Sequence, residues 1–283
     1  MRNFCIIANN EKENSEKYAY EIQSYLIEKG CVCDTISAGP SMSYREDIKP
    51  GTECLIVLGG DGTVIHAAKE AAKEQIPIYG INCGGVGFLT DSDRGISWSS
   101  IDRLINDDFV IERRMMLAGK VEGEEKDADA TIYTLNDFSI SRREYRGLIQ
   151  FEVHINGELL DTFRADGVVV STPTGSTAYN LSAGGPVISP EVEAIVVTPI
   201  CPHSINDRSF VIGGNDVIDI KLLDGKHADV DSAIVFADGD MVSVVKSGDM
   251  LHIEKAVVDT NIITMKKTNF YHKMRIKLIT GGK

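Results

Sequence analysis

A glycine-rich turn holding one aspartate lies between an apolar run at 55–58 and a helical pattern at 63–74. The turn itself, at 59–62, reads Gly-Gly-Asp-Gly. Such a turn before a helix suits an anion such as phosphate, because backbone N–H groups and the helix dipole point toward it. The carboxylate of Asp61 therefore stands where a negatively charged ligand is expected.

Two arrangements make a carboxylate useful beside bound phosphates. A divalent cation can bridge the negative groups, or the carboxylate can accept the proton of a hydroxyl that attacks phosphorus. The turn is neither a P-loop nor the Gly-x-Gly-x-x-Gly dinucleotide motif, because Gly80 is the next glycine after Gly62. The pattern favours phosphoryl transfer, with Asp61 either beside a bridging cation or as the acceptor of the hydroxyl proton. The alternative is a strand-to-helix turn in which Asp61 is only a helix cap.

A second polar motif, Ser-Thr-Pro-Thr-Gly-Ser-Thr-Ala-Tyr-Asn, occupies 171–180 after a strand-like run at 168–170. Its hydroxyls and backbone N–H groups can donate to phosphate or ribose, and Tyr179 can stack on a base. Clusters of Ser, Thr, Gly and Pro are also common in plain turns. The presence of the Asp61 loop in the same chain favours the ligand-binding interpretation.

Two weaker motifs also follow apolar runs. Asn136 can pair with the N6/N7 edge of adenine, and the adjacent Asp137 carboxylate can accept a ribose hydroxyl. The segment 83–89, Cys-Gly-Gly-Val-Gly-Phe-Leu, can approach a ligand closely and offers Phe88 for stacking. For both motifs an ordinary turn or a loop with positive φ at glycine is the alternative.

The elements that must position these residues form two patterns. Up to about residue 114, short apolar runs at 4–9, 31–36, 54–58 and 76–82 alternate with helical patterns at 15–30 and 63–74. That alternation predicts a doubly wound α/β domain with a parallel sheet.

From residue 115 the chain changes to β-type alternation, with a hairpin signal at Asn156-Gly157. Strand-like runs at 217–223, 233–245 and 250–256 continue it, and predict an all-β second domain over 115–265. The last stretch, 268–279, can close that domain or return to the first.

Composition limits the partners. The 283 residues contain 29 Lys and Arg against 42 Asp and Glu, a net charge of −13, which argues against a nucleic-acid or anionic-membrane binder. The six cysteines form no Cys-x-x-Cys pair, and no apolar run is long enough for a signal peptide or membrane span. We expect free thiols and a cytoplasmic protein.

The motifs, taken together and in order, resemble those of the NAD kinase family. The residues that carry the resemblance are Gly-Gly-Asp-Gly-Thr at 59–63, Gly-x-Gly-Phe-Leu at 85–89, Leu-Asn-Asp at 135–137, DGVVVSTPTGSTAYNLSAGGP at 166–186 and TPICPHSINDRSF at 198–210. The long fourth motif is highly specific. Gly-Gly-Asp-Gly alone is not, because diacylglycerol and sphingosine kinases and phosphofructokinases share it.

The resemblance implies an N-terminal α/β domain, a C-terminal β-sandwich-like domain, a tail at about 266–283 that returns to the first domain, and an active site between the domains. It further implies NAD and ATP as substrates, Mg²⁺ or another divalent metal, no metal-ligand set of the protein's own, and a homodimer or homotetramer. Asp61 would be the base that activates the 2′-hydroxyl of the adenosine ribose.

The resemblance also assigns ligand contacts. Adenine contacts map onto Asn136, Thr174, Thr177 and Ala178. Residues around the rest of the dinucleotide map onto Asp166, Tyr179 and Ser182, and the same motifs add Gly62, Phe88, Asp137, Asn180 and Leu181. His66 and Arg164 match positions that often line the substrate site, with a helix-face residue and a surface charge as their alternatives. Many relatives have Glu where this sequence has Asp137, so this sequence departs from the family pattern at the position expected to contact the ribose, with a shorter side chain.

Two rival functions remain at this point. One is a lipid kinase that shares Gly-Gly-Asp-Gly, although no basic amphipathic segment is apparent. The other is a non-catalytic dinucleotide-binding module in which Asp61 caps a helix. Vesicle binding distinguishes the first rival, and NAD binding without transfer distinguishes the second.

Overall fold

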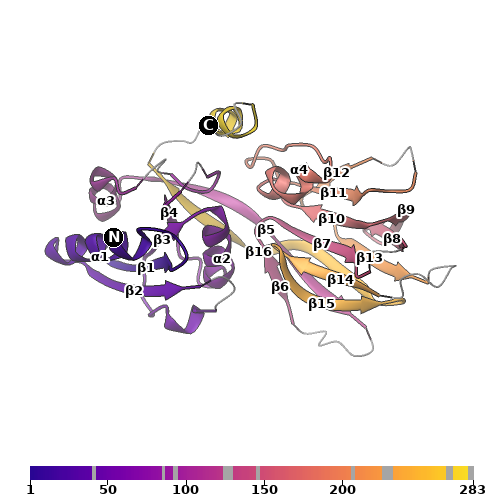
Figure 1. The fold of residues 1–283 in the computed structure, drawn as a ribbon, viewed down its shortest axis with the longest axis horizontal. Coiled ribbons are helices and arrows are strands. Elements are labelled where there is room, and N and C mark those ends of the chain that lie inside the picture. Colours follow the sequence, from indigo (N-terminus) through magenta and orange to yellow (C-terminus); the bar gives the residue numbers. More distant parts are fainter. Residues whose placement is uncertain are drawn as a thin grey trace. The chain divides into compact units, whose positions relative to one another are not determined.

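The computed structural model describes residues 1–39, 43–84, 87–91, 95–123, 130–144, 147–204, 208–224, 232–265 and 270–279. The chain divides into two compact units (Figure 1), one comprising Met1–Arg114 with Val258–Lys283 and the other Met115–Val257. Strands β5 (Val110–Glu122) and β16 (Met250–Thr264) contain the boundaries, so each belongs partly to both units. Of the expected tail, 266–269 and 280–283 lie outside the described residues.

The first unit is built on a parallel sheet. Its strands are ordered β2 (Val32–Ala38), β1 (Asn3–Asn9), β3 (Cys54–Gly59) and β4 (Ile78–Asn82), and the end of β16 pairs with β4. All six residues of β3 are buried, as expected for a parallel strand covered on both faces. The chain starts in the middle of the sheet, moves to one edge, and then returns to continue on the other side.

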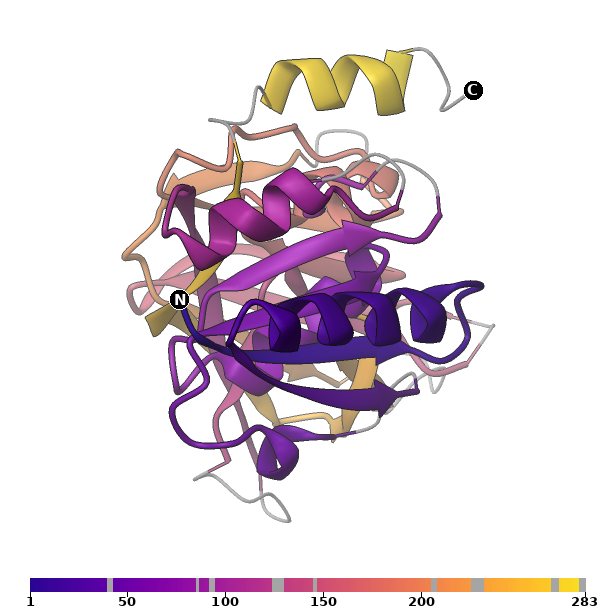
Figure 2. The ribbon, with the colours of Figure 1, turned by 90° about the vertical axis from the view of Figure 1, so that its left-hand side faces the viewer.

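Helices cover both faces of this sheet. On one face, α1 (Ser15–Glu28) and α3 (Trp98–Ile105) pack Ile22 and Ile101 into a core with Ile56 of β3 (Figure 2). On the other face lies α2 (Asp61–Ala71). It packs closely on β4, because a Cβ added to Gly80 would lie only 3.1 Å from Cγ2 of Val64. The predicted doubly wound α/β domain is confirmed.

The second unit contains two β layers. The first is a six-stranded antiparallel sheet in the order β12 (Phe210–Gly213), β11 (Ala194–Ile200), β10 (Gly167–Ser171), β7 (Asp137–Arg142), β14 (Ser232–Ala237) and β15 (Asp240–Lys246). The second contains β16, β13 (Ile218–Leu223), β8 (Ile149–Ile155) and β9 (Glu158–Ala165), with β5 pairing β16 and β6 (Ile132–Thr134).

Alternate residues of the two layers form one apolar core. Phe138 of β7 and Val170 of β10 share it with Phe151 of β8 and Ile220 of β13. The turn at Asn156-Gly157, where both residues have positive φ, joins β8 to β9. The predicted all-β sandwich and its hairpin are therefore confirmed.

Several short helical segments lie between and after the strands. The 3-10 helix η1 (Arg45–Asp47) precedes β3, while η2 (Gly175–Thr177) and α4 (Tyr179–Ser182) lie within the second polar motif. Helix α5 (Phe270–Met274) continues directly into the π-helical turn η3 (Arg275–Ile279). Within the described residues, no helix is both long and apolar enough to cross a lipid bilayer.

Candidate active site

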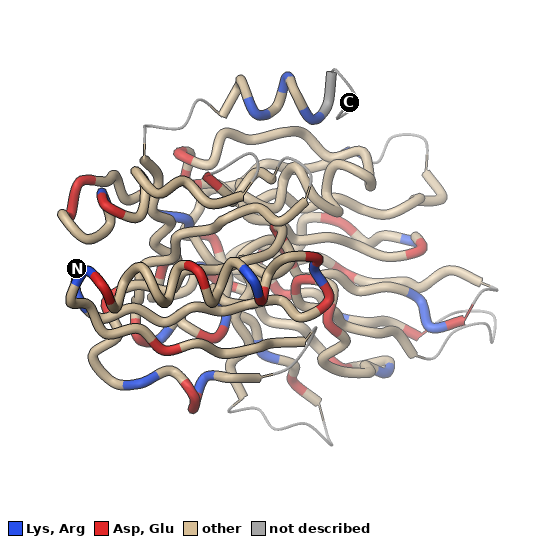
Figure 3. Tube along the Cα trace, turned by 60° about the vertical axis from the view of Figure 1, so that its left-hand side comes forward, with Lys and Arg blue, Asp and Glu red and all other residues tan. Residues whose placement is uncertain are grey.

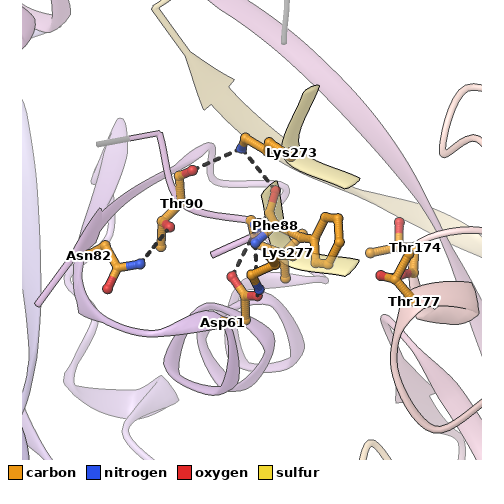
Figure 4. Close-up of polar contacts among 9 residues, drawn as sticks. Asp61, Asn82, Phe88, Thr90, Thr174, Thr177, Lys273 and Lys277 are labelled. Carbon is orange, nitrogen blue, oxygen red and sulfur yellow. Dashed lines mark hydrogen bonds and ion pairs between the residues drawn. The ribbon is translucent and has the colours of Figure 1, made fainter. Parts of the chain in front are cut away.

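Asp61 is the first residue of α2, and its carboxylate faces the segment 87–90 (Figure 4). Oδ2 accepts the backbone N–H of Phe88 at 2.8 Å, and Oδ1 accepts that of Leu89 at 2.9 Å. Oδ2 also accepts the ammonium of Lys277 at 3.0 Å. All three donors lie outside α2, so the described bonds of Asp61 are not those of a capping residue. The carboxylate is fixed by two peptide groups and paired with one cation.

Gly87 allows the close approach of the segment 87–90 to the start of α2. A Cβ on Gly87 would lie 2.4 Å from Oδ1 of Asp61 and 2.3 Å from Oγ1 of Thr90. Gly60, in extended conformation, precedes α2, and its carbonyl accepts the N–H groups of Thr63 and Val64. A side chain at position 87 would therefore push the carboxylate away from its N–H donors.

The segment 87–90 is itself held by a half-buried lysine. Nζ of Lys273 donates to the carbonyl oxygens of Phe88 at 3.0 Å and Thr90 at 2.9 Å. Nδ2 of Asn82 donates to Oγ1 of Thr90 at 3.3 Å. Burial lowers the pKa of Lys273 below its ordinary value. The segment that fixes Asp61 thus depends on a side chain from α5.

Lys277 is held from two sides. Its Nζ lies 3.0 Å from Oδ2 of Asp61 and 4.4 Å from the centroid of the Phe88 ring, a cation–π distance. The Phe88 ring in turn lies 6.3 Å from that of Phe270. Neither lysine was predicted from the sequence. Their signal is the i, i+3, i+7 spacing of Phe270, Lys273 and Lys277, which places them on one helical face.

The second unit contains a cavity of about 470 Å³. Its lining residues come from β7, α4 and the residue before each of them, and from strand β14 and the β14–β15 turn: Asn136, Asp137, Ser139, Ser141, Arg142, Ala178, Tyr179, Phe236, Asp238 and Gly239. Two aromatic side chains, two carboxylates, an amide and a guanidinium line it. Such a mixture of a stacking surface and hydrogen-bonding groups suits a polar, ring-containing ligand.

Two carboxylates in this cavity differ in their surroundings. Asp238, in the β14–β15 turn with a φ of 51°, accepts the backbone N–H groups of Leu135, Asn136 and Asp137 at 2.9, 2.7 and 3.2 Å. Asp137 is buried, and its burial, followed by the charge of Asp238, raises its pKa to about 7. The protonation of Asp137 therefore changes near neutral pH.

The second polar motif, 171–180, is hydrogen-bonded to the backbone carbonyls of Leu135 and Asn136. Oγ1 of Thr172 donates to the Leu135 carbonyl at 2.6 Å, and the Thr172 N–H donates to that of Asn136 at 2.8 Å. A Cβ on Gly175 would lie 2.3 Å from the Asn136 carbonyl oxygen. The side chains of Asn136 and Tyr179 are thereby presented by one rigid unit.

Comparison with known proteins decides the family. Residues 135–265 match the ATP-NAD kinase C-terminal domain, and residues 40–109 match the ATP-NAD kinase N-terminal domain. The chain is 36% identical over 281 residues to NAD kinase of Lachnoclostridium phytofermentans, covering 98% of this chain and 99% of that protein. The chain belongs to the NAD kinase family. NAD kinase of Lachnospira eligens is 39% identical over 295 residues, covering 98% and 100%.

Solved structures of NAD kinase relatives share the fold. Yeast NADH kinase complexed with NADH superposes with a TM-score of 0.88 at 22% identity, covering 100% of this chain and 89% of that one. An NAD kinase from Archaeoglobus fulgidus in complex with ATP gives a TM-score of 0.74 at 23% identity, covering 97% and 99%.

The cavity brings together four of the residues predicted from the NAD kinase motifs. They are Asn136, Asp137, Ala178 and Tyr179. Asp166 forms an ion pair with the cavity residue Arg142, whose Nε lies 3.2 Å from Oδ1. Arg142, Asp238 and the two serines of β7 were not predicted.

Other predicted residues lie apart from the cavity lining. Asn180 is fully buried, where its side chain donates to the Pro186 carbonyl at 3.0 Å and accepts from Thr198 at 2.7 Å. Arg164 is exposed on β9, and its carbonyl accepts the His203 N–H. Half-buried positions are occupied by Thr174, Thr177 and Leu181, whereas Ser182 is exposed.

Two predicted residues of α2 accompany Asp61 in the first unit. Gly62 is exposed in the first turn of the helix. His66 is half-buried, with its ring 5.2 Å from the ring of the buried Tyr44. Phe88, by contrast, lies directly at Asp61 through its N–H and its ring contact with Lys277.

Proposed function

We propose that this chain transfers the γ-phosphoryl group of ATP to the 2′-hydroxyl of the adenosine ribose of NAD, giving NADP. Membership of the NAD kinase family supports the activity. The observation that supports the mechanism is the carboxylate of Asp61, held at the start of α2 by two backbone N–H groups. Those bonds fix its orientation without engaging all of its acceptor sites.

In the proposed reaction Asp61 accepts a proton. The 2′-oxygen forms a bond to the γ-phosphorus, the bond from that phosphorus to the β,γ-bridging oxygen breaks, and ADP leaves with the electron pair. The hydroxyl proton passes to the carboxylate. Among described partners Oδ1 accepts one hydrogen bond and Oδ2 accepts two, so we assign the proton to Oδ1.

The cavity of the second unit is proposed to hold the adenosine of NAD. The Asn136 amide suits the N6/N7 edge of adenine, and the exposed ring of Tyr179 suits stacking on the base. Asp137 is proposed to contact a ribose hydroxyl, as a donor when protonated and as an acceptor when ionised. Thr174, Thr177 and Ala178 are proposed as further adenine contacts, and the other predicted contacts are proposed to serve the rest of the dinucleotide.

Mg²⁺ is proposed to enter with ATP. The described residues include no group of three or more His, Cys, Asp or Glu side chains that could hold a metal ion. Magnesium in phosphoryl-transfer enzymes is commonly held largely by substrate phosphates and water, with one or two carboxylates. We therefore treat the metal as part of the MgATP substrate and assign no step to it.

A cytoplasmic location and a homodimer or homotetramer complete the proposal. All six cysteines are free, and burial raises the pKa of both Cys5 and Cys33 to about 12, which suits reduced, unreactive thiols. The family resemblance supports the oligomer. Light scattering on the purified protein measures the number of subunits directly.

The deciding experiment incubates the purified protein with NAD, ATP and Mg²⁺ and measures NADP with an NADP-specific dehydrogenase. NAD lacking the adenosine 2′-oxygen should bind as a competitive inhibitor and give no phosphorylated product. Phosphate on the nicotinamide-side ribose would refute the proposed acceptor. NAD binding without transfer from any phosphate donor would favour the non-catalytic module, and lipid phosphorylation on vesicles would favour the lipid kinase.

A further inference from the structure

We propose that Lys277 is a catalytic residue that contacts the transferring phosphoryl group. This inference rests on the proposed function, because it assumes that Asp61 accepts the proton of the attacking hydroxyl. It assigns a role in the reaction to the segment 270–279, which carried no predicted site residue.

The placement of Lys277 is determined by contacts that three residues of its segment make with 87–90 and Asp61. Lys273, one turn earlier, is anchored by two backbone carbonyls of 87–90, and the Phe270 ring packs near that of Phe88. The Lys277 ammonium then lies between the Asp61 carboxylate and the Phe88 ring. Its side chain is 24% exposed, so it is partly withdrawn from water. A partly desolvated ammonium interacts more strongly with anions than a surface lysine does.

Charge makes this segment unusual in the chain. Residues 270–279 contain Lys273, Arg275 and Lys277 and no acidic residue, although the whole protein carries a net charge of −13 (Figure 3). Of these three, Lys273 and Lys277 have described bonds to the Asp61 region, while Arg275 is exposed. The basic side chains directed at 87–90 and Asp61 match an anionic ligand.

The position of the Lys277 ammonium beside Asp61 places it within reach of a phosphoryl group attacked by the hydroxyl that Asp61 deprotonates. A general base lies roughly 2.6–3.2 Å from the oxygen it deprotonates, and that oxygen lies about 3–3.5 Å from the phosphorus it attacks. Since Nζ of Lys277 is 3.0 Å from Oδ2 of Asp61, it can reach the equatorial phosphoryl oxygens by a rotation of its side chain.

The chemical benefit comes from the transition state. Phosphoryl transfer proceeds through a loose transition state with negative charge spread over three equatorial oxygens, where a cation is most effective. As the 2′-oxygen forms its bond to phosphorus and ADP departs, the Asp61 carboxylate gains the proton and loses its charge. The ammonium of Lys277 then exchanges the neutralised carboxyl for a phosphoryl oxygen. The ion pair with Asp61 is thus its resting position.

An inhibitory ion pair between Lys277 and Asp61 would give the opposite result. If the ion pair only blocked the carboxylate, removing the ammonium would free Asp61 and raise kcat/KM. A catalytic cation instead makes its removal lower kcat while leaving the KM for NAD nearly unchanged, because the contact strengthens in the transition state.

The test compares Lys277→Met, Lys277→Arg and Lys277→Ala in the full-length protein. We expect Lys277→Met to lower kcat roughly 10²–10³-fold with the KM for NAD within about threefold. Lys277→Arg should recover most of the loss. Lys277→Ala should regain activity when methylammonium is added, a rescue that a purely structural role would not give. Arg275→Met, which removes an exposed cation from the same turn, is the matched control and should resemble the parent.

The outcomes separate this inference from the proposed function. Asp61→Asn, measured in parallel, tests the base itself. If Asp61→Asn abolishes turnover while Lys277→Met retains the parent kcat, Lys277 is not catalytic and the proposed function stands. A higher kcat/KM in Lys277→Met would identify a blocking contact. A loss in Lys277→Met that is restored neither in Lys277→Arg nor by methylammonium in Lys277→Ala would also overturn the inference, because it would indicate a folding role.

Discussion

Two aspartates, one in each unit, show how different surroundings suit a carboxylate to different tasks. Asp61 accepts two backbone N–H groups and a lysine ammonium, and these contacts fix the direction of its carboxylate. Asp137 is buried beside a second carboxylate, and its pKa is raised to about 7. The first is placed like a base awaiting a proton, whereas the second can hold a proton near neutral pH.

The comparison teaches that residue type alone does not assign a role. A carboxylate oriented by N–H donors can accept a proton at a defined point, which suits a reaction whose rate depends on geometry. A desolvated carboxylate that titrates near neutrality can donate or accept a hydrogen bond, which suits recognition of a hydroxyl. Replacing Asp61 should therefore change kcat, whereas replacing Asp137 should change the pH dependence of stability.

The largest effect is expected for Asp61→Asn. The amide retains the size of the side chain but loses the charge and the capacity to accept a proton, so kcat should fall roughly 10²–10⁴-fold. The KM for NAD should stay within a few fold, because the proposed adenosine contacts are made by other residues. Steady-state kinetics with NAD and MgATP measure both. A catalytic constant within about threefold of the parent would remove Asp61 as the base.

Gly87→Ala tests whether the direction of the Asp61 carboxylate matters apart from its charge. The new Cβ would lie 2.4 Å from Oδ1, so the carboxylate must move away from its donors. A displacement of about 1 Å can cost on the order of 10²-fold in rate, and we expect a loss of that order in kcat.

Gly84→Ala is the matched control for that substitution. Its Cβ would meet only Oδ1 of Asn82, at 3.8 Å, which is an ordinary contact. The variant should keep the parent rate and stability. Equal activity in both alanine variants would show that the position of the Asp61 carboxylate is not critical.

The fold was largely predictable because its two halves have different local patterns. Helix α1 was expected at 15–30 and occupies Ser15–Glu28, since its apolar residues recur on one face. Helix α2 begins at Asp61, before the expected 63–74, because the Gly60 carbonyl already accepts its first N–H groups. Strand β16 continues to Thr264, beyond the expected 256, because its end pairs with β4 at Ile262.

The site was only partly predictable because several partners come from distant segments. Asn136 and Tyr179 could be predicted from their residue types, because an amide can pair with adenine and a tyrosine ring can stack on a base. Both line the cavity. Asp238 does not, because it reaches Asp137 through pairing of β7 with β14, across 101 residues of sequence. Lys277 lies 216 residues from Asp61. Local periodicity shows which residues share a face but not which segment that face meets.

Asn136→Ala should mainly weaken NAD binding. The amide is proposed to contact the adenine edge, which does not change between ground and transition states, so KM should rise while kcat is nearly constant. One lost hydrogen bond is worth about 1 kcal/mol, which corresponds to roughly a fivefold change. Isothermal titration with NAD measures the same loss without catalysis. An unchanged affinity would remove Asn136 from the binding site.

The effect expected from Asp137→Asn concerns stability and its dependence on pH. Because the folded-state pKa is about 7 against an ordinary 3.8, the native protein keeps a proton that the unfolded chain releases as pH rises between these values. The parent should therefore lose stability across that interval by up to about 1.4 kcal/mol per pH unit from this group, and the neutral asparagine variant should not. Relative to the parent, the variant should gain stability from pH 4 to 7 and show no further gain above it.

Urea unfolding of the parent and Asp137→Asn at pH 5 and pH 8 measures this difference, with Asp161→Asn, on the exposed part of β9, as control. The variant's free energy of unfolding should exceed the parent's by more at pH 8 than at pH 5, because the buried carboxylate of the parent has by then become charged beside Asp238. A difference that is equal at both pH values would mean that Asp137 ionises as freely in the folded protein as in the unfolded chain. The contrast between the two aspartates would then reduce to their hydrogen-bond partners alone.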